Sequence, residues 1–199
     1  MPDRDPRLSA LRAALEKRTP LRGEPDPSLA QAAVLLMLRP TSPLELLLIQ
    51  RAEQEGDPWS GHMALPGGRR EPRDRSLLST ALRETEEEVG IVVPDTLILG
   101  ALDELRPTSR HRFRLTIAPY VAAVPVETTP VPAPAEVEVA VWMPLPHLLD
   151  DEAVDEVLIE LEGESFSLPA LNYQEYVIWG LTHRILTDFM DVAREAGLV

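Results

Sequence analysis

An acidic segment with helical spacing, directly after a Pro-Gly-Gly turn, constrains this sequence more than any other feature. The turn occupies residues 66–68, and glutamates follow at 84, 86, 87 and 88. On an α-helix, Glu84, Glu87 and Glu88 stand at i, i+3 and i+4, so their carboxylates share one face. Like charges this close repel one another, and a stable fold tolerates them best when a cation lies between them. Oxygen ligands of this kind suit Mg²⁺ or Mn²⁺.

The residues around the glutamates predict a helix with defined ends. The segment Leu77–Val89 contains no proline or glycine. Asp74 or Ser76 can cap its N-terminus, and Gly90 follows its last residue, where left-handed backbone is favoured. Apolar side chains recur at helical spacing beside the acidic face, so the helix packs on a core while its edge offers carboxylates to a cleft.

Not every charge on this helix is expected to serve a site. Arg83 lies four residues before Glu87 and is placed to pair with it and fix its orientation. Glu86 points away from the other glutamates and is expected to be solvated. The alternative for the whole segment is a solvated acidic helix, because most runs of charge are only that.

These residues resemble the Nudix box, Gly-x5-Glu-x7-Arg-Glu-U-x-Glu-Glu-x-Gly-U, in which U is aliphatic. The second half matches at Arg83, Glu84, Glu87, Glu88, Gly90 and Ile91. The first half is shifted, because a strict count places Arg69 and Arg75 at its Gly and Glu positions. One extra residue before the helix restores Gly68 and puts Asp74 at the acidic position. The resemblance covers roughly residues 32–192 and implies a Nudix fold, a mixed β-sheet in an α/β/α sandwich.

The resemblance also implies a reaction, the hydrolysis of a diphosphate linked to another moiety with the help of Mg²⁺ or Mn²⁺. The residues that it implicates in catalysis are Arg83, Glu84, Glu87 and Glu88. The metal ligands that it implies are Glu84, Glu87, Glu88 and the carbonyl of Gly68. Arg83 would orient the glutamates, supported by Asp74. The general base stays open between a box glutamate such as Glu88 and a glutamate outside the box, for which Glu136 and Glu138 are candidates.

Residues upstream of the box point to a substrate. The coenzyme A pyrophosphatase subgroup carries the pattern Leu-Leu-Thr-x-Arg-Ser-x3-Arg-x3-Gly-x3-Phe-Pro-Gly-Gly. This sequence matches it at Leu47, Leu48, Arg51, Gly61, Pro66, Gly67 and Gly68. The second arginine of the pattern is absent, and Asp57 holds its place. Residues 178–186 also resemble a segment near the C-terminus of that subgroup.

The resemblance therefore implies hydrolysis of coenzyme A to 3′,5′-adenosine bisphosphate and 4′-phosphopantetheine. Two alternatives remain open. One is a hydrolase of the same family that acts on ADP-ribose, a dinucleotide or a nucleotide. The other is a Nudix-like ligand-binding domain without catalysis.

Other residues are candidates for contacts with such a substrate. Guanidinium groups match phosphate oxygens, which favours Arg51, Arg69 and Arg70 as phosphate ligands. His62 and His111 are candidate proton carriers, and Trp59 is a candidate for stacking on adenine. Each also has an ordinary interpretation as a surface or packing residue. Trp179 is expected to lie in the core.

Composition narrows the class of protein further. A chain of 199 residues is expected to form a single domain overall, with residues 1–28 as a helix and Pro-rich connection before a Nudix domain at 29–199. The net charge of −14 argues against nucleic-acid and anionic-membrane binding. The apolar stretches are too short to span a bilayer, and no signal peptide is recognisable, so a cytoplasmic location is expected. The expected partner is a small nucleoside diphosphate, and a homodimer stays open.

The remaining periodicity predicts strands interleaved with helices. Strands are expected at 31–38, 44–51, 62–65, 96–105, 113–124, 137–142, 157–161 and 165–168. Helices are expected at 7–18, 77–89, 146–150 and 177–195. Pro119 implies that its strand lies at an edge or contains a bulge, and residues 125–136 are expected to be an exposed loop.

Overall fold

A mixed β-sheet forms the centre of the molecule. The computed structural model describes residues 5–24, 26, 28–54, 60–106, 114–161 and 164–198. Within these residues the sheet runs in the order β3-β2-β1-β6-β5, with β4 beside β1 and β7 beside β2. The strands are β1 (Ala30–Arg39), β2 (Glu45–Arg51), β3 (Met63–Ala64), β4 (Gly67–Arg69), β5 (Ile98–Ala101), β6 (Leu115–Ala123) and β7 (Val137–Pro144). The pair β1–β6 is parallel and the others are antiparallel, so the sheet is mixed.

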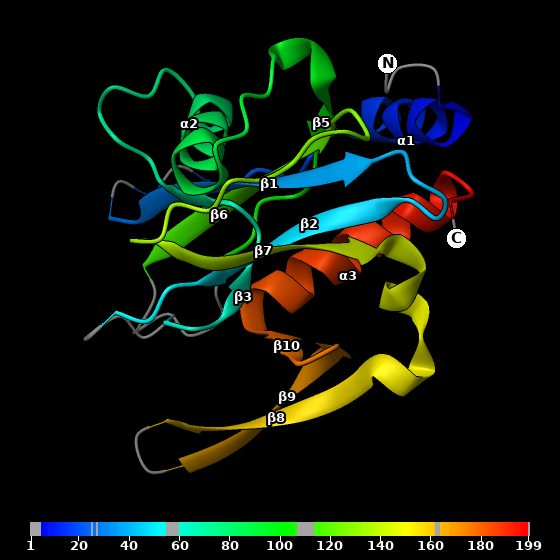
Figure 1. Ribbon diagram of the computed structural model, residues 1–199. Helices are drawn as coiled ribbons and strands as arrows, with labels where there is room; N and C mark the ends of the chain where they lie inside the picture. Colours follow the sequence, from blue (N-terminus) through cyan, green and yellow to red (C-terminus); the bar gives the residue numbers. More distant parts are fainter. Residues whose placement is uncertain are drawn as a thin grey trace.

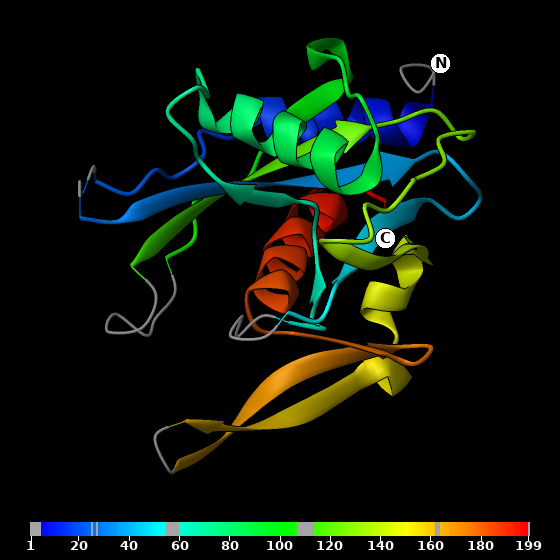
Figure 2. The same ribbon diagram turned by 60° about the vertical axis from the view of Figure 1, so that its left-hand side comes forward.

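Helices cover both faces of this sheet (Figures 1 and 2). Helix α2 (Leu77–Val89) lies on one face, and helix α3 (Gly180–Glu195) lies on the other. Helix α1 (Pro6–Lys17) buries three leucines, at 8, 11 and 15, in the cluster that also contains the apolar face of α3. The expected α/β/α sandwich is therefore confirmed.

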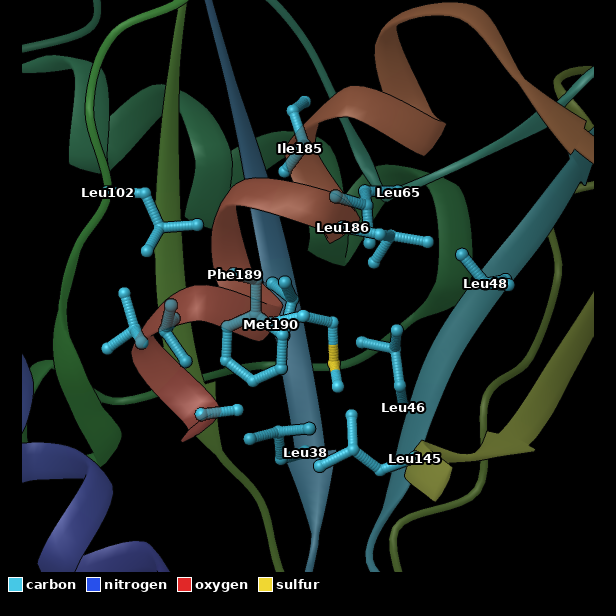
Figure 3. Close-up of a cluster of buried hydrophobic side chains, with 14 of the residues drawn as sticks. Leu38, Leu46, Leu48, Leu65, Leu102, Leu145, Ile185, Leu186, Phe189 and Met190 are labelled. Atoms are coloured by element: carbon cyan, nitrogen blue, oxygen red, sulfur yellow. The ribbon is translucent and has the colours of Figure 1, made fainter. Parts of the chain in front are cut away.

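Strand β1 separates two hydrophobic clusters because it is buried on both faces. Its residues alternate between the cluster under α2, which includes Leu35, and the cluster under α3, which includes Leu36. Figure 3 shows the second cluster, where Phe189 and Met190 of α3 lie over leucines of β1 and β2. Burial on both faces explains why β1 reads as a continuous apolar run rather than an alternating one.

A second, three-stranded sheet projects from the α3 side of the molecule (Figures 1 and 2). Its strands β8 (Val154–Leu161), β9 (Glu164–Tyr173) and β10 (Tyr176–Trp179) are antiparallel, in the order β10-β9-β8. Two 3₁₀ turns, η3 (Leu145–Leu149) and η4 (Asp151–Ala153), lead into it from β7. The hairpin expected across 162–164 is present, with longer strands than the sequence indicated.

Four local predictions were wrong. Residues 177–179 belong to strand β10 rather than to the last helix, which begins at Gly180, where φ is 65°. Gly67–Arg69 forms strand β4 rather than a turn. The strand expected at 96–105 shrinks to β5, preceded by a 3₁₀ turn η2 (Asp95–Leu97). Pro119 lies in β6, an interior strand rather than an edge strand, and the irregularity in the β5–β6 pairing falls in β5, between Ile98 and Gly100. The Pro119 carbonyl accepts the Leu102 N–H, and its missing N–H lies just beyond the last residue that pairs with β5.

Candidate active site

Local capping fixes the position of the acidic helix α2. Ser76, not Asp74, is its N-cap, and Ser76 and Ser79 form a reciprocal capping box. Gly90 ends the helix in the left-handed conformation, with φ of 65°, as the sequence predicts. Residues 125–136 then fold back on this end, where the Ala133 N–H donates to the Glu88 carbonyl at 2.9 Å. This loop satisfies carbonyls that the end of a helix leaves unpaired.

A cavity of about 490 Å³ lies between α2, strand β4 and the first turn of α3. The cavity is lined by eight of the residues discussed in the sequence analysis: Arg51, His62, Gly68, Arg69, Glu84, Glu88, Glu136 and Trp179. The fold thus brings two of the box glutamates together with residues that are far from them in the sequence.

Glu88 lies deepest in this group, with 2% of its surface exposed. One of its carboxylate oxygens, Oε2, accepts the Gly67 N–H at 2.8 Å. Burial raises the pKa of Glu88 to about 8, and the negative charges of Glu84 and Glu136 add to the rise against the opposing effects of the Gly67 N–H and Arg51. A carboxyl group with such a pKa is mostly protonated at neutral pH when no cation is bound.

Glu84 lies beside Glu88 and touches strand β4. A Cβ atom added to Gly68 would lie 2.5 Å from the Glu84 carboxyl carbon, so this strand approaches the carboxylate closely because it carries no side chain there. Burial raises the pKa of Glu84, and the ion pair with Arg83, at 2.9 Å, works in the opposite direction. Gly68 itself lies inside the β1–β4 ladder, opposite Ala33.

Glu87 does not line the cavity. It forms ion pairs with Arg83 at 2.7 Å and with Arg73 at 3.1 Å, and 44% of its side chain is exposed. In the described part of the chain, no three acidic, histidine or cysteine side chains are gathered closely enough to hold a metal ion. The structure therefore places Glu84 and Glu88 together and leaves the third predicted ligand outside the cavity.

Arg83 and Asp74 form the buried ion pair that supports this helix. Both Asp74 oxygens accept from the Arg83 guanidinium, at 3.0 Å and 2.9 Å. The Glu71 N–H and the Thr80 hydroxyl also donate to Asp74. The hydrogen bonds from Arg83 hold the pKa of Asp74 far below its ordinary value, and Asp74 raises the pKa of Arg83 in return. Arg83 thus touches Asp74, Glu84 and Glu87 at once.

The remaining candidates divide between the cavity and the surface. Arg51 and Arg69 line the cavity, whereas Arg70 pairs with Gln31 at 2.9 Å and is not among the lining residues. The rings of His62 and Trp179 meet edge to face at 4.7 Å at the cavity, so Trp179 is a half-buried lining residue rather than a core residue. Glu138 is exposed on β7. Asp57, Trp59 and His111 lie outside the described residues.

Two supporting contacts were not anticipated from the sequence. The Gly67 N–H binds the buried carboxylate of Glu88. The Gln54 side-chain amide donates to the Ala135 carbonyl at 2.7 Å, next to Glu136, and so ties the end of β2 to the loop that carries this glutamate. A pairing of this kind depends on the approach of two distant segments, for which a single sequence offers no signal.

The donor set of the cavity fits a divalent cation. Glu84 and Glu88 supply hard carboxylate oxygens, and Glu136 adds a third acidic residue to the lining. Two carboxyl groups with raised pKa values mark a place where negative charge is disfavoured until a cation arrives. Glu87 can join such a set only by giving up its ion pairs with Arg73 and Arg83.

An α/β/α sandwich whose acidic helix packs directly on a glycine strand, at the edge of a cavity, is the arrangement expected of domains that carry a Nudix box. A family model described as the NUDIX domain matches residues 28–161. This chain therefore belongs to the Nudix family.

Individual relatives agree with this assignment. The chain is 34% identical over 159 residues to the uncharacterized Nudix hydrolase NudL of Yersinia pestis, covering 78% of this chain and 76% of the relative. NudL of Yersinia pseudotuberculosis matches equally. Among solved structures, a MutT/nudix family protein from Enterococcus faecalis has a TM-score of 0.56 at 21% identity, covering 90% of this chain and 66% of that one. The NUDIX domain of Shewanella oneidensis NrtR, complexed with ADP ribose, has a TM-score of 0.51 at 26% identity, covering 63% of this chain and 82% of that one.

Proposed function

We propose that this protein is a Mg²⁺- or Mn²⁺-dependent hydrolase that cleaves the diphosphate of coenzyme A or its derivatives. The observation that carries the proposal is the meeting of Glu84 and Glu88 of the box with Arg51 of the upstream pattern in one cavity. The box accounts for cleavage of a diphosphate, and the upstream pattern accounts for the choice of coenzyme A. The products would be 3′,5′-adenosine bisphosphate and 4′-phosphopantetheine.

Each residue of the site has a physical role in this proposal. Glu84 and Glu88 would hold the cation, with Glu87 and the Gly68 carbonyl as the further ligands that the family pattern implies. The cation would supply Lewis-acid stabilisation of the charge that develops on the diphosphate oxygens. Arg51 and Arg69 line the same cavity and would bind those oxygens directly. Arg70 does not line the cavity and pairs with Gln31, so it is not assigned to the diphosphate.

The site also needs groups that orient the glutamates and a group that accepts a proton. Arg83 holds Glu84 and Glu87 in place, and Asp74 fixes Arg83 from its buried side. Glu88 is one candidate for the base; its pKa is about 8 without a cation and would fall if a cation bound its carboxylate, so it could serve as the base only where it is not a ligand. Glu136 is the second candidate for the base, because it lines the same cavity from outside the box.

One observation favours a second substrate. The similar NUDIX domain of Shewanella oneidensis NrtR was solved as a complex with ADP ribose. ADP-ribose shares the adenosine 5′-diphosphate of coenzyme A, but it lacks the 3′-phosphate and differs in the second moiety. Hydrolysis of ADP-ribose, a dinucleotide or a nucleotide is thus the alternative reaction. The alternative to a hydrolase is a domain that binds such a ligand without catalysis.

The wider setting follows from the chain itself. We place the protein in the cytoplasm as a single domain, with α1 packed on the Nudix core and a small nucleoside diphosphate as its partner. None of the helices in the described part of the chain is long and apolar enough to cross a membrane. A homodimer is compatible with this proposal.

The proposal is tested by incubating the purified protein and Mn²⁺ with coenzyme A, ADP-ribose, NADH and diadenosine polyphosphates in parallel. Mass spectrometry of the products identifies both the substrate and the bond that is cleaved. The variant Glu88→Gln should lose at least about a hundredfold in kcat, while Glu86→Gln, an exposed glutamate on the same helix, should retain activity. Absence of turnover with every compound, or equal turnover by Glu88→Gln, would rule out catalysis at this site.

A further inference from the structure

The cavity has two chemically different sides. Charged side chains occupy the side formed by α2 and by the segments that carry Arg51 and Glu136. The opposite side is formed by β1, β6 and α3. Its side chains are mainly aliphatic, namely those of Ala32, Val34, Leu115, Ile117, Leu181 and Ile185.

The two sides meet at Gly67. Its N–H donates to the Glu88 carboxylate at 2.8 Å, and its position in the β1–β4 ladder is opposite Val34. A Cβ atom added to Gly67 would lie 2.8 Å from a methyl carbon of Val34, so this side chain packs directly on the glycine. Gly67 therefore contacts both the buried carboxylate of Glu88 and Val34 on the aliphatic side, so the two sides of the cavity are direct neighbours.

The aliphatic side offers little to a hydroxyl group. Among the described lining residues of β1, β6 and α3, Thr182 has the only side-chain hydroxyl or amide. That hydroxyl already donates to the Met63 carbonyl at 3.0 Å. The Thr182 oxygen can still accept from one sugar hydroxyl. The other hydroxyls of a sugar buried here would lose their hydrogen bonds to water without gaining one from these side chains, whereas a hydrocarbon group would gain from leaving water.

We propose that the aliphatic side selects diphosphates whose second moiety begins with a neutral, branched hydrocarbon over those whose second moiety is a polyhydroxylated sugar. This inference rests on the proposed function, because it assumes that the diphosphate lies at Glu84 and Glu88. Coenzyme A satisfies the requirement, since a methylene and a dimethyl-substituted carbon follow its diphosphate. ADP-ribose does not, because a ribose stands in that place.

Two synthetic esters of ADP separate this chemistry from the rest of coenzyme A. The neopentyl and dihydroxypropyl esters have the same number of heavy atoms, and they differ in carrying methyl groups or hydroxyl groups beside the diphosphate. The neopentyl ester should have a kcat/KM at least about tenfold higher. Turnover of both esters at equal rates, or a preference for the dihydroxypropyl ester, would overturn the inference and leave the proposed hydrolase intact.

Equilibrium binding distinguishes the failure of the inference from the failure of the proposed function. The Glu88→Gln protein is titrated with both esters in a calorimeter, where no turnover is needed. Tighter binding of the neopentyl ester without turnover by the wild type would support the selective side and reject the hydrolase. Equal binding of both esters would reject the selective side.

Substitutions on β1 and β6 locate the preference. Val34→Thr replaces a methyl group with a hydroxyl at nearly constant shape and should lower the neopentyl-to-dihydroxypropyl ratio of kcat/KM by about threefold or more. Ile117→Thr should act in the same direction. Val139→Thr, a half-buried valine of β7 that does not line the cavity, should leave the ratio unchanged. Because each ratio is measured within one protein, partial unfolding cancels, and an unchanged ratio in both cavity variants would overturn the placement.

Discussion

Replacing Asp74 by asparagine tests whether the buried pair with Arg83 holds the acidic helix in place. Asp74 has a side chain that is only 4% exposed and accepts four hydrogen bonds, two from Arg83, one from the Glu71 N–H and one from the Thr80 hydroxyl. Asparagine keeps the shape but turns one of the two acceptor oxygens into a donor group. In either orientation its amide then faces at least one donor, and Arg83 loses its buried counter-charge.

The expected cost is about 3 kcal/mol in the free energy of unfolding, because one partner of a buried ion pair is removed while the other stays. Arg83 keeps Glu84 and Glu87 as partners, which places the cost at the lower end of the range for such pairs. Urea denaturation with an unchanged slope measures it. The matched control is Asp191→Asn, whose pair with Arg194 lies on the surface with both side chains more than half exposed, and which should cost less than about 1 kcal/mol.

The pH dependence of the free energy of unfolding gives an independent check, because the direction of the change is fixed by the lowered pKa of Asp74. Arg83 holds the pKa of Asp74 far below its ordinary value of 3.8, so the pair stabilises the folded state fully above that value. The stabilisation is lost as the pH falls from 3.8 toward the lower, folded-state pKa. The difference between the wild type and Asp74→Asn should therefore be constant near neutral pH and shrink in acid. A cost below about 1 kcal/mol, or a difference that grows in acid, would refute the argument.

Three further perturbations have defined outcomes. Ser76→Ala removes the side-chain cap of α2 and should cost about 1 kcal/mol in urea denaturation, and a cost near zero would mean that the cap is replaced by water. Gly67→Ala should lower the free energy of unfolding by at least about 2 kcal/mol, because φ is 152° and the new Cβ atom would meet the backbone of Ala33 and Val34. The control is Gly197→Ala, where φ is 68° and no neighbour lies within 4 Å, and it should cost only about 1 kcal/mol. In EDTA, the free energy of unfolding of the wild type should fall relative to that of Glu88→Gln as the pH rises from 4.5 to about 8. The reason is that the folded state holds the Glu88 proton over that range and the unfolded state does not. Parallel plots of the free energy of unfolding against pH would contradict the raised pKa.

The sequence predicts the acidic helix well because its determinants are local. Capping residues, the absence of proline and glycine, and a C-terminal glycine define Leu77–Val89 without reference to the rest of the chain. Strand β1 is equally predictable, since burial on both faces leaves an uninterrupted apolar run. Strand β10 is not, because residues 177–179 are apolar in a pattern that also suits the start of an amphipathic helix. Only pairing with β9 decides between the two.

The site is predictable in composition and less so in geometry. Helical spacing places Glu84, Glu87 and Glu88 on one face, but it does not decide which of them a neighbouring segment will cover. Strand β4 and the loop at 125–136 contact Glu88. Glu87 instead pairs with Arg73 and Arg83, and its side chain stays partly exposed. The aliphatic side of the cavity comes from three elements far apart in the chain, so no local pattern indicates it.

The carboxylates of α2 need a cation, and in the metal-free protein two different charges meet that need. Arg83 neutralises Glu84 and Glu87 from the same helix, and a proton neutralises Glu88. A divalent cation that binds Glu84 and Glu88 must displace that proton at any pH below about 8. Calorimetry of Mg²⁺ binding near neutral pH in buffers of different ionisation enthalpy should therefore detect the release of close to one proton, which Glu88→Gln abolishes. Binding without proton release would mean that the cation does not use Glu88, which would then keep its proton.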